Sequence, residues 1–206
     1  MRVLPRRPVV LVVLLVALAG ACSGGDKGAA GGGDPATPGA APTGAPGPYS
    51  FTVTGREVHP MAPEAPLFPE DVSEAVTAGL NTWLGAGVVE PFRSGKPPLG
   101  LEAVFTEPAL ARIAVPGPER AAMVEEGAPL TGPVVQDRAN ARLTVVTAPD
   151  GAAAFVTVQI DVSHAVTVDG AAVDVVRAGE LVLVPDRGSW RIDAFDVVTK
   201  RDTRPR

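Results

Sequence analysis

Three ionisable side chains in the second half of the chain, Asp137, His164 and Arg177, are of types that could carry chemistry. A carboxylate beside an imidazole makes an ionisable pair, and a neighbouring guanidinium adds a fixed positive charge. At the bottom of an apolar pocket, such a group would bind the polar part of a ligand or exchange a proton with it. The alternative is structural: Asp137 and His164 would bond each other at the polar end of a sheet. The strands that carry these residues decide between the two.

The sequence predicts an antiparallel meander after Gly132. Four runs in which β-branched residues alternate with polar ones predict strands, and they cover residues 134–147, 153–168, 172–184 and 189–200. Asp150-Gly151 and Asp169-Gly170 separate the first three runs, and Asp186-Arg187-Gly188 precedes the last. Asp-Gly between alternating segments is a strong hairpin signal. Consecutive hairpins make neighbouring strands antiparallel.

The first hairpin sets a register that can be tested. With Asp150-Gly151 as a two-residue loop, Leu143 faces Val158, and the other pairs on that face are also apolar. The residues between them are polar, so one face of the sheet should be buried and the other wet. Continued toward the far end, the same register places Asp137 opposite His164.

The second hairpin brings in the guanidinium. Around Asp169-Gly170, His164 faces Val175, and Arg177 becomes a diagonal neighbour of the imidazole on the same face. This holds unless Gly179 marks a β-bulge, which would turn Arg177 to the opposite face.

No sequence motif for a known catalytic or metal site accompanies these residues. The chain lacks HExxH, CxxC, GxxxxGK[ST], GxGxxG and GxSxG. Ser163 and His164 are adjacent on a strand, so they point to opposite faces and cannot form a nucleophile–base pair. We therefore predict no catalytic residue, metal or cofactor. We expect His59 to lie in a solvated proline-rich loop, and Glu125 and Glu126 to end a helix in solvent.

The only cysteine, Cys22, lies in a motif for lipid attachment. The segment Leu18-Ala19-Gly20-Ala21-Cys22 follows three arginines and an apolar run that is too short to span a bilayer. This pattern is typical of a bacterial lipobox. It predicts that residues 1–21 are a signal peptide, and that Cys22 carries acyl chains such as palmitate. The protein would then be anchored to the cell membrane and face outward, without a disulfide.

A tether and an acidic domain follow the anchor. Gly, Pro and Ala make up 20 of the 26 residues from Ser23 to Pro48. Residues 22–48 should therefore be a disordered spacer with a span of about 28 Å, and 49–203 should be one domain. Removal of residues 1–21 takes three of the 18 Lys and Arg residues and none of the 23 acids, so the formal charge changes from −5 to −8. This argues against binding to nucleic acid.

One basic cluster stands apart from the acidic background. It lies at the end of the chain and comprises Lys200, Arg201, Arg204 and Arg206. We interpret it first as a solvated terminus, and second as a contact to a lipid headgroup or to the cell wall.

Helices are expected before the meander. An apolar stripe with its acids in the first turn predicts a helix from Pro69 that ends at Gly85 or Gly87. A second helix follows Thr106, and a third covers residues 119–126. Residues 49–55 alternate and predict a short strand.

The chain resembles a group of actinobacterial lipoproteins across residues 65–200. The segments that carry the resemblance are 105–110, 117–121, 126–129, 179–184 and 188–192, the last being Gly-Ser-Trp-Arg-Ile. The order of helices and strands is similar to the nuclear-transport-factor-2-like (cystatin-like) fold. The resemblance implies an α+β cone with N-terminal helices packed on a curved four-stranded antiparallel meander. Asp137, His164 and Arg177 would then line its concave pocket. Enzymes of this fold place an acidic base beside a tyrosine or acid donor, but the only tyrosine here, Tyr49, borders the tether.

Three functions fit these expectations. The first is a non-catalytic lipoprotein whose domain binds an envelope protein or an apolar small ligand. The second is a cyclase- or isomerase-type enzyme that uses Asp137 and His164. The third is an assembly factor for an envelope complex. A homodimer could form through the open sheet face, whose side chains are Arg142, Thr144, Phe155, Thr157, Gln159 and Asp161.

Overall fold

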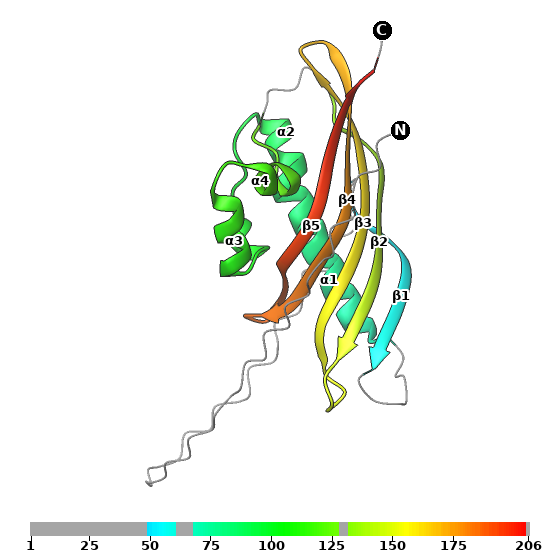
Figure 1. The fold of residues 1–206 in the computed structure, drawn as a ribbon. Helices are drawn as coiled ribbons and strands as arrows, with labels where there is room; N and C mark the ends of the chain where they lie inside the picture. Colours follow the sequence, from blue (N-terminus) through cyan, green and yellow to red (C-terminus); the bar gives the residue numbers. More distant parts are fainter. Residues whose placement is uncertain (1–48, 61–67, 128–131, 205–206) are drawn as a thin grey trace, which may run out of the picture. The chain divides into compact units, whose positions relative to one another are not determined.

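The computed structural model describes residues 49–60, 68–127 and 132–204 (Figure 1). The predicted signal peptide, Cys22 and the predicted tether lie outside the described residues. Within the described part, no helix has the length and apolar composition needed to span a bilayer.

The domain is a mixed α+β fold built on one sheet of five strands, not four. The strands lie in sequence order across the sheet, and they are β1 (Thr52–Pro60), β2 (Val135–Thr147), β3 (Ala153–Val168), β4 (Ala171–Asp186) and β5 (Ser189–Thr203). Strands β2 to β5 form the predicted antiparallel meander. The additional strand β1 pairs with β2 in parallel, Val58 opposite Val145.

Strand β1 is longer than the strand predicted over residues 49–55. It runs through His59 to Pro60, so His59 is a solvent-exposed strand residue and not a loop residue. A proline at the end of an edge strand interrupts no ladder of hydrogen bonds in the sheet interior. A parallel pair also needs a long crossover connection, which the helices between β1 and β2 supply.

The predicted register of the first hairpin is confirmed, although its turn differs. Leu143 lies opposite Val158, as predicted. Ala148 N–H donates to the carbonyl of Ala152 at 2.8 Å, so three residues form the loop, and Gly151 is left-handed with φ of 84°. A three-residue loop with a glycine of this conformation introduces a bulge. The shift at Val146 restores the predicted pairing.

The second and third turns are tight two-residue loops. Asp169-Gly170 and Arg187-Gly188 both have positive φ at both positions. This conformation matches the twist of antiparallel strands. His164 consequently lies opposite Val175, as the sequence predicts.

The helices lie before β2 and on one face of the sheet (Figure 1). They are α1 (Glu70–Trp83), a π-helical segment (Leu84–Val89), α2 (Glu90–Ser94), a 3-10 turn (Leu101–Ala103), α3 (Glu107–Ala114) and α4 (Pro118–Met123). The first α-helix ends at Trp83, close to the end predicted at Gly85 or Gly87, but the chain stays helical beyond these glycines. The helical segment continues to Gly95, which is left-handed with φ of 65° and closes α2.

The core fills the space between the helices and the sheet. Trp83, Leu80 and Phe92 from the helical side meet Leu143 and Leu181 of the sheet in one buried cluster. Helices α1, α3 and α4 all contact β5. On the opposite face, the residues of β2 and β3 are mostly polar, so the division into a buried and a wet face that the first hairpin predicts is confirmed there. The part of this face on β4 and β5 also carries apolar residues, such as Val182 and Val198.

Gly179 allows β4 and β5 to approach each other closely. The β3–β4 register is continuous through Gly179, so this glycine does not turn Arg177 to the other face. A Cβ atom at position 179 would lie 2.7 Å from Cα of Val197, and the φ of Gly179 is 155°. Arg177 therefore points into the core beneath the helices.

Candidate functional site

The structure brings His164 and Arg177 together and leaves Asp137 apart. Arg177 pairs with Val162 and His164 with Val175, so the two are diagonal neighbours on the helix-covered face. Both side chains are fully buried. This part of the prediction from the sequence is confirmed.

Asp137 does not face His164, so that predicted pairing is wrong. The register shifts between Gln136 and Arg138, and Gln136 lies opposite His164. A bulge of this kind adds one residue to the strand and redirects the side chains around it. Asp137 is exposed, and it accepts a long hydrogen bond from Ser163 Oγ at 3.5 Å. Since Ser163 and His164 point to opposite faces, the carboxylate has left the buried face.

Arg177 is paired with a carboxylate that the sequence did not predict. Its Nη2 donates to Glu125 Oε1 in a buried ion pair, and its Nε donates to the carbonyl of Ala122 at 3.2 Å. Arg201 Nη2 contacts both oxygens of Glu125, at 2.8 and 2.7 Å. The side chain of Glu125 is 4% exposed and that of Arg201 is 46% exposed. We call these three residues the arginine–glutamate cluster.

The backbone after α4 holds Glu125 in this position. The carbonyl of Ala122 accepts from Arg177 and also from Thr199 Oγ1 at 3.1 Å. The N–H of Glu125 donates to the carbonyl of Gly87 at 2.9 Å. The segment is therefore fixed by strands on one side and by the π-helical segment on the other. Glu125 is buried, so the expectation that it is solvated is wrong.

The charged tail contains ion pairs that the sequence did not predict. Strand β5 extends to Thr203, and Arg201 is part of the cluster. Arg204 pairs with Asp174 at 2.6 Å. Arg201 is a strand residue and Arg204 follows the strand. Both are exposed, as the interpretation as a solvated terminus expects, but each has an ion-pair partner. Arg206 lies outside the described residues.

Burial lowers the pKa of both buried bases. Desolvation is the main cause of the lowered pKa of Arg177, and the charge of Glu125 opposes it. Desolvation, followed by repulsion from Arg177, lowers the pKa of His164 to about 4. His164 is therefore neutral at pH 7. Within the described residues, neither of its ring nitrogens has a hydrogen-bond partner, and neither has Arg177 Nη1. A fully buried imidazole is a core residue and does not meet a substrate.

A signal for the cluster is present in the strand register. Val175 lies opposite Arg201, and Arg177 is two residues away on the same face. Two guanidinium groups on a covered face require a carboxylate, because an unpaired buried charge is strongly destabilising. The register does not say which of the chain's carboxylates supplies it.

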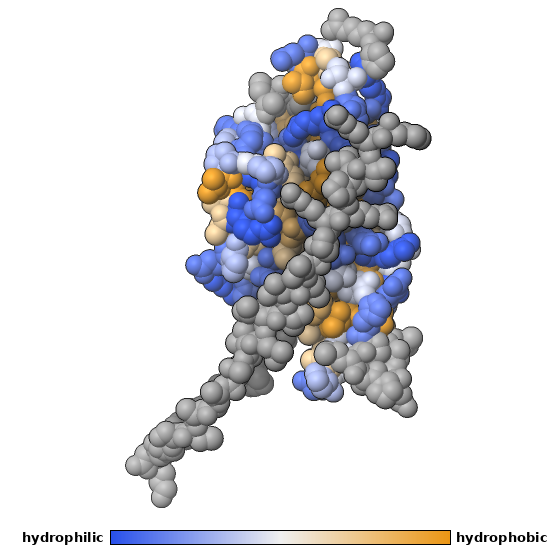
Figure 2. Space-filling model, in the orientation of Figure 1, coloured by the Kyte–Doolittle hydropathy of each residue, from blue (hydrophilic) through white to orange (hydrophobic). Residues whose placement is uncertain are grey.

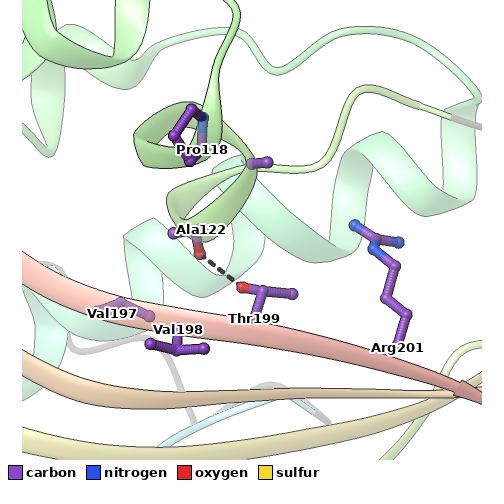
Figure 3. Close-up of a pocket in the computed structure, with 7 residues that line it drawn as sticks. Pro118, Ala122, Val197, Val198, Thr199 and Arg201 are labelled. Carbon is purple, nitrogen blue, oxygen red and sulfur yellow. Dashed lines mark hydrogen bonds between the residues drawn. The ribbon is translucent and has the colours of Figure 1, made fainter. Parts of the chain in front are cut away.

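A surface pocket of about 500 Å³ lies beside the cluster, between α4 and β5 (Figure 3). Most of its lining is apolar, and the lining residues are Pro118, Ala121, Ala122, Val197, Val198, Thr199 and Arg201. Figure 3 shows Thr199 bonded to the carbonyl of Ala122, with Arg201 at one end of the pocket. Its volume lies in the range of small-molecule sites, and apolar walls with a few polar groups are typical of them.

Polar residues cover most of the described surface in the view of Figure 2, and the hydrophobic areas there are small and separate. Among the described residues, no three His, Cys, Asp or Glu side chains gather closely enough to hold a metal ion. Comparison of the chain with protein-family models, with curated proteins and with solved structures finds no match. The α4–β5 pocket combines apolar walls with a charged end.

Replacement of Glu125 by Gln should destabilise the domain severely. The substitution keeps the size of the side chain but leaves the buried guanidinium of Arg177 without a counter-charge, which costs about 3–5 kcal/mol. Urea unfolding followed by tryptophan fluorescence would measure the loss. Glu126→Gln is the matched control, because Glu126 forms an exposed ion pair with Arg120, and such pairs contribute under about 1 kcal/mol. Equal losses in the two variants would contradict the buried-pair interpretation.

Acid should destabilise the domain through His164. The imidazole of the unfolded chain binds a proton near pH 6.5, whereas in the folded protein its pKa is about 4. Between these values the unfolded state holds the additional proton, so stability falls as the pH falls through this window, by up to about 3 kcal/mol.

Two histidine variants test this prediction. His164→Leu should remove this part of the pH dependence, whereas His59→Leu, at an exposed position, should retain it. The measurement is the free energy of unfolding at pH 7 and at pH 4.5 for each variant. Identical pH dependences for the two variants would show that His164 is protonated as readily in the folded state as in the unfolded chain.

Proposed function

We propose that this chain is an outward-facing lipoprotein of the cell membrane, whose domain binds an apolar small ligand without catalysis. The pocket of about 500 Å³ between α4 and β5 is the observation that carries the binding function. In this proposal residues 1–21 are a removed signal peptide, Cys22 carries the lipid, residues 22–48 are a tether and residues 49–203 are the domain. The support for the anchor is the segment Leu18-Ala19-Gly20-Ala21-Cys22 behind its apolar run.

The proposed lipid would hold the domain at the membrane without help from its charge. Each buried methylene contributes about 0.8 kcal/mol, so two or three acyl chains supply on the order of 20 kcal/mol. The tether would let the domain explore a distance of about 28 Å from the bilayer. A ligand site on such a domain could collect an apolar compound near the membrane or pass it to a partner in the envelope.

The proposal includes a version of the cone related to nuclear transport factor 2. The support is the order of helices before a meander, with the helices on one face of the sheet. Two features depart from the expected cone: the parallel strand β1, and an interior in which His164 and Arg177 are fully buried. We therefore place the ligand at the α4–β5 edge and not in the cone interior.

The geometry favours binding over the enzyme alternative. A cyclase or isomerase site built on Asp137 and His164 needs the two side chains together in a solvent-accessible pocket. Asp137 is exposed outside the buried face, and His164 is buried within it. The two residues cannot act on the same substrate atom, so we do not propose catalysis by this pair.

The uncovered sheet face gives weaker support for a homodimer. Arg138 and Asp161 form an ion pair there at 2.7 Å, and Arg142 and Gln159 are exposed. Stable dimer interfaces have a more apolar core than this β2–β3 part of the face. The proposal therefore concerns one copy of the chain and its ligand.

Replacement of Cys22 by Ala should abolish lipid attachment and release the protein from the membrane. Cells that express wild-type or Cys22→Ala protein would be grown with a clickable fatty acid, and the label on the purified protein would be measured. We expect label in the wild type and none in the variant, since the chain has one cysteine. Persistent label in Cys22→Ala would contradict the anchor.

Filling the pocket should block the binding of an apolar probe. The probe is dodecanol with a diazirine group, and mass spectrometry locates its photo-crosslinks on the full chain in neutral phosphatidylcholine vesicles. Wild-type protein should be labelled in residues 118–122 and 197–201. Ala121→Trp places an indole in the pocket and should remove most of that label. Ala111→Trp, at an exposed position on α3, is the matched control and should not. Equal labelling of both variants would reject the pocket as the binding site.

A further inference from the structure

The arginine–glutamate cluster contains two positive charges and one negative charge, so its net charge is positive. Glu125 is the counter-ion of both Arg177 and Arg201, so two cations share one carboxylate. Neighbouring ion pairs are balanced within themselves: Arg120 pairs with Glu126, and Arg204 with Asp174. The excess charge therefore belongs to the cluster.

Arg201 presents this excess charge to the pocket. The residue lines one end of the pocket, and its side chain is 46% exposed. Among the described residues, both of its hydrogen bonds go through Nη2 to Glu125. Its Nε and Nη1 groups therefore have donors to offer, and a carboxylate can accept a charge-assisted hydrogen bond from either of them.

Arg177 competes with Arg201 for the negative charge of Glu125. Arg177 is fully buried, bonds to Glu125, and has Nη1 without a partner in the described part of the chain. Because Arg177 already draws on the charge of Glu125, less of that charge is left to compensate Arg201. The pocket thus has apolar walls at Pro118, Ala121 and Val197 and a net cation at one end.

We infer that the pocket takes a single-chain amphipathic acid, with its chain against α4 and β5 and its carboxylate on Arg201. This inference rests on the proposed function and names the class of ligand for the same site. A volume of about 500 Å³ suits one small ligand. A neutral chain contacts the same apolar walls, but the donors of Arg201 then stay hydrogen-bonded to water. The acid therefore binds more tightly.

The test compares two probes that differ only in their head groups. Diazirine-bearing dodecanoate and dodecanol are titrated against the full chain in phosphatidylcholine vesicles, at a pH at which the acid is ionised. The half-maximal concentration for crosslinking of residues 118–122 and 197–201 is measured for each probe. A hydrogen bond to a charged group supports a preference for the acid of about ten-fold. Higher salt should reduce the preference and leave the alcohol unaffected, because Arg201 is partly exposed.

Three variants assign the preference to Arg201. Arg201→Gln should lose the preference for the acid, and Arg201→Lys should keep part of it. Arg204→Gln removes an equal charge three residues further along the chain, outside the pocket, and should keep the full preference. For each variant, crosslinking by the alcohol shows whether the pocket is intact.

The failures of the two proposals are distinguishable. Equal half-maximal concentrations for acid and alcohol in the wild type would overturn the inference and leave the apolar site standing. Loss of preference in both Arg201→Gln and Arg204→Gln would also overturn it, because the general charge of the surface would then be responsible. Crosslinks that avoid the pocket with both probes would overturn the proposed function itself.

Discussion

The buried guanidinium of Arg177 is the constraint on which the arrangement of the helical layer depends. Its side chain points from β4 into the core, where a charge without a partner would be strongly destabilising. Glu125 supplies the partner, and it does so from the segment after α4, far away in the sequence. The need to compensate one charge therefore ties the end of the helical region to the middle of the sheet.

Hydrogen bonds of the backbone around Glu125 connect this ion pair to the neighbouring helices. Trp83 Nε1 donates to the carbonyl of Met123 at 2.8 Å, and Glu125 N–H donates to that of Gly87. A side chain at position 87 would lie 3.2 Å from the indole of Trp83, so a residue without one lets the π-helical segment approach. The same contacts place α4 over β5, and α4 forms one wall of the pocket. The charge pair in the core and the apolar site at the surface are thus parts of one arrangement.

The sequence predicts those features that depend on neighbours along the chain. Tight turns such as Asp169-Gly170 fix strand pairing locally, and the positions of His164 and Arg177 on one face follow from it. The parallel pairing of β1 depends on a crossover of many residues, and no local pattern encodes it. The bulge at Asp137 also has no signal in the sequence, because apolar and polar residues alternate regularly on both sides of it. Glu125 was missed because its burial depends on two arginines in distant strands.

Burial, and not residue type, decides what each ionisable group can do here. His164 and Arg177 look like a site by type and spacing, yet they are fully buried, and structural networks perturb pKa values as active sites do. Arg201 looks like part of a solvated tail, yet the partly exposed member of the cluster is the one that can meet a ligand. The core pair holds Glu125 in place, and Glu125 in turn orients Arg201 at the pocket. A chemical role at the surface therefore depends on a charge balance that is set in the interior.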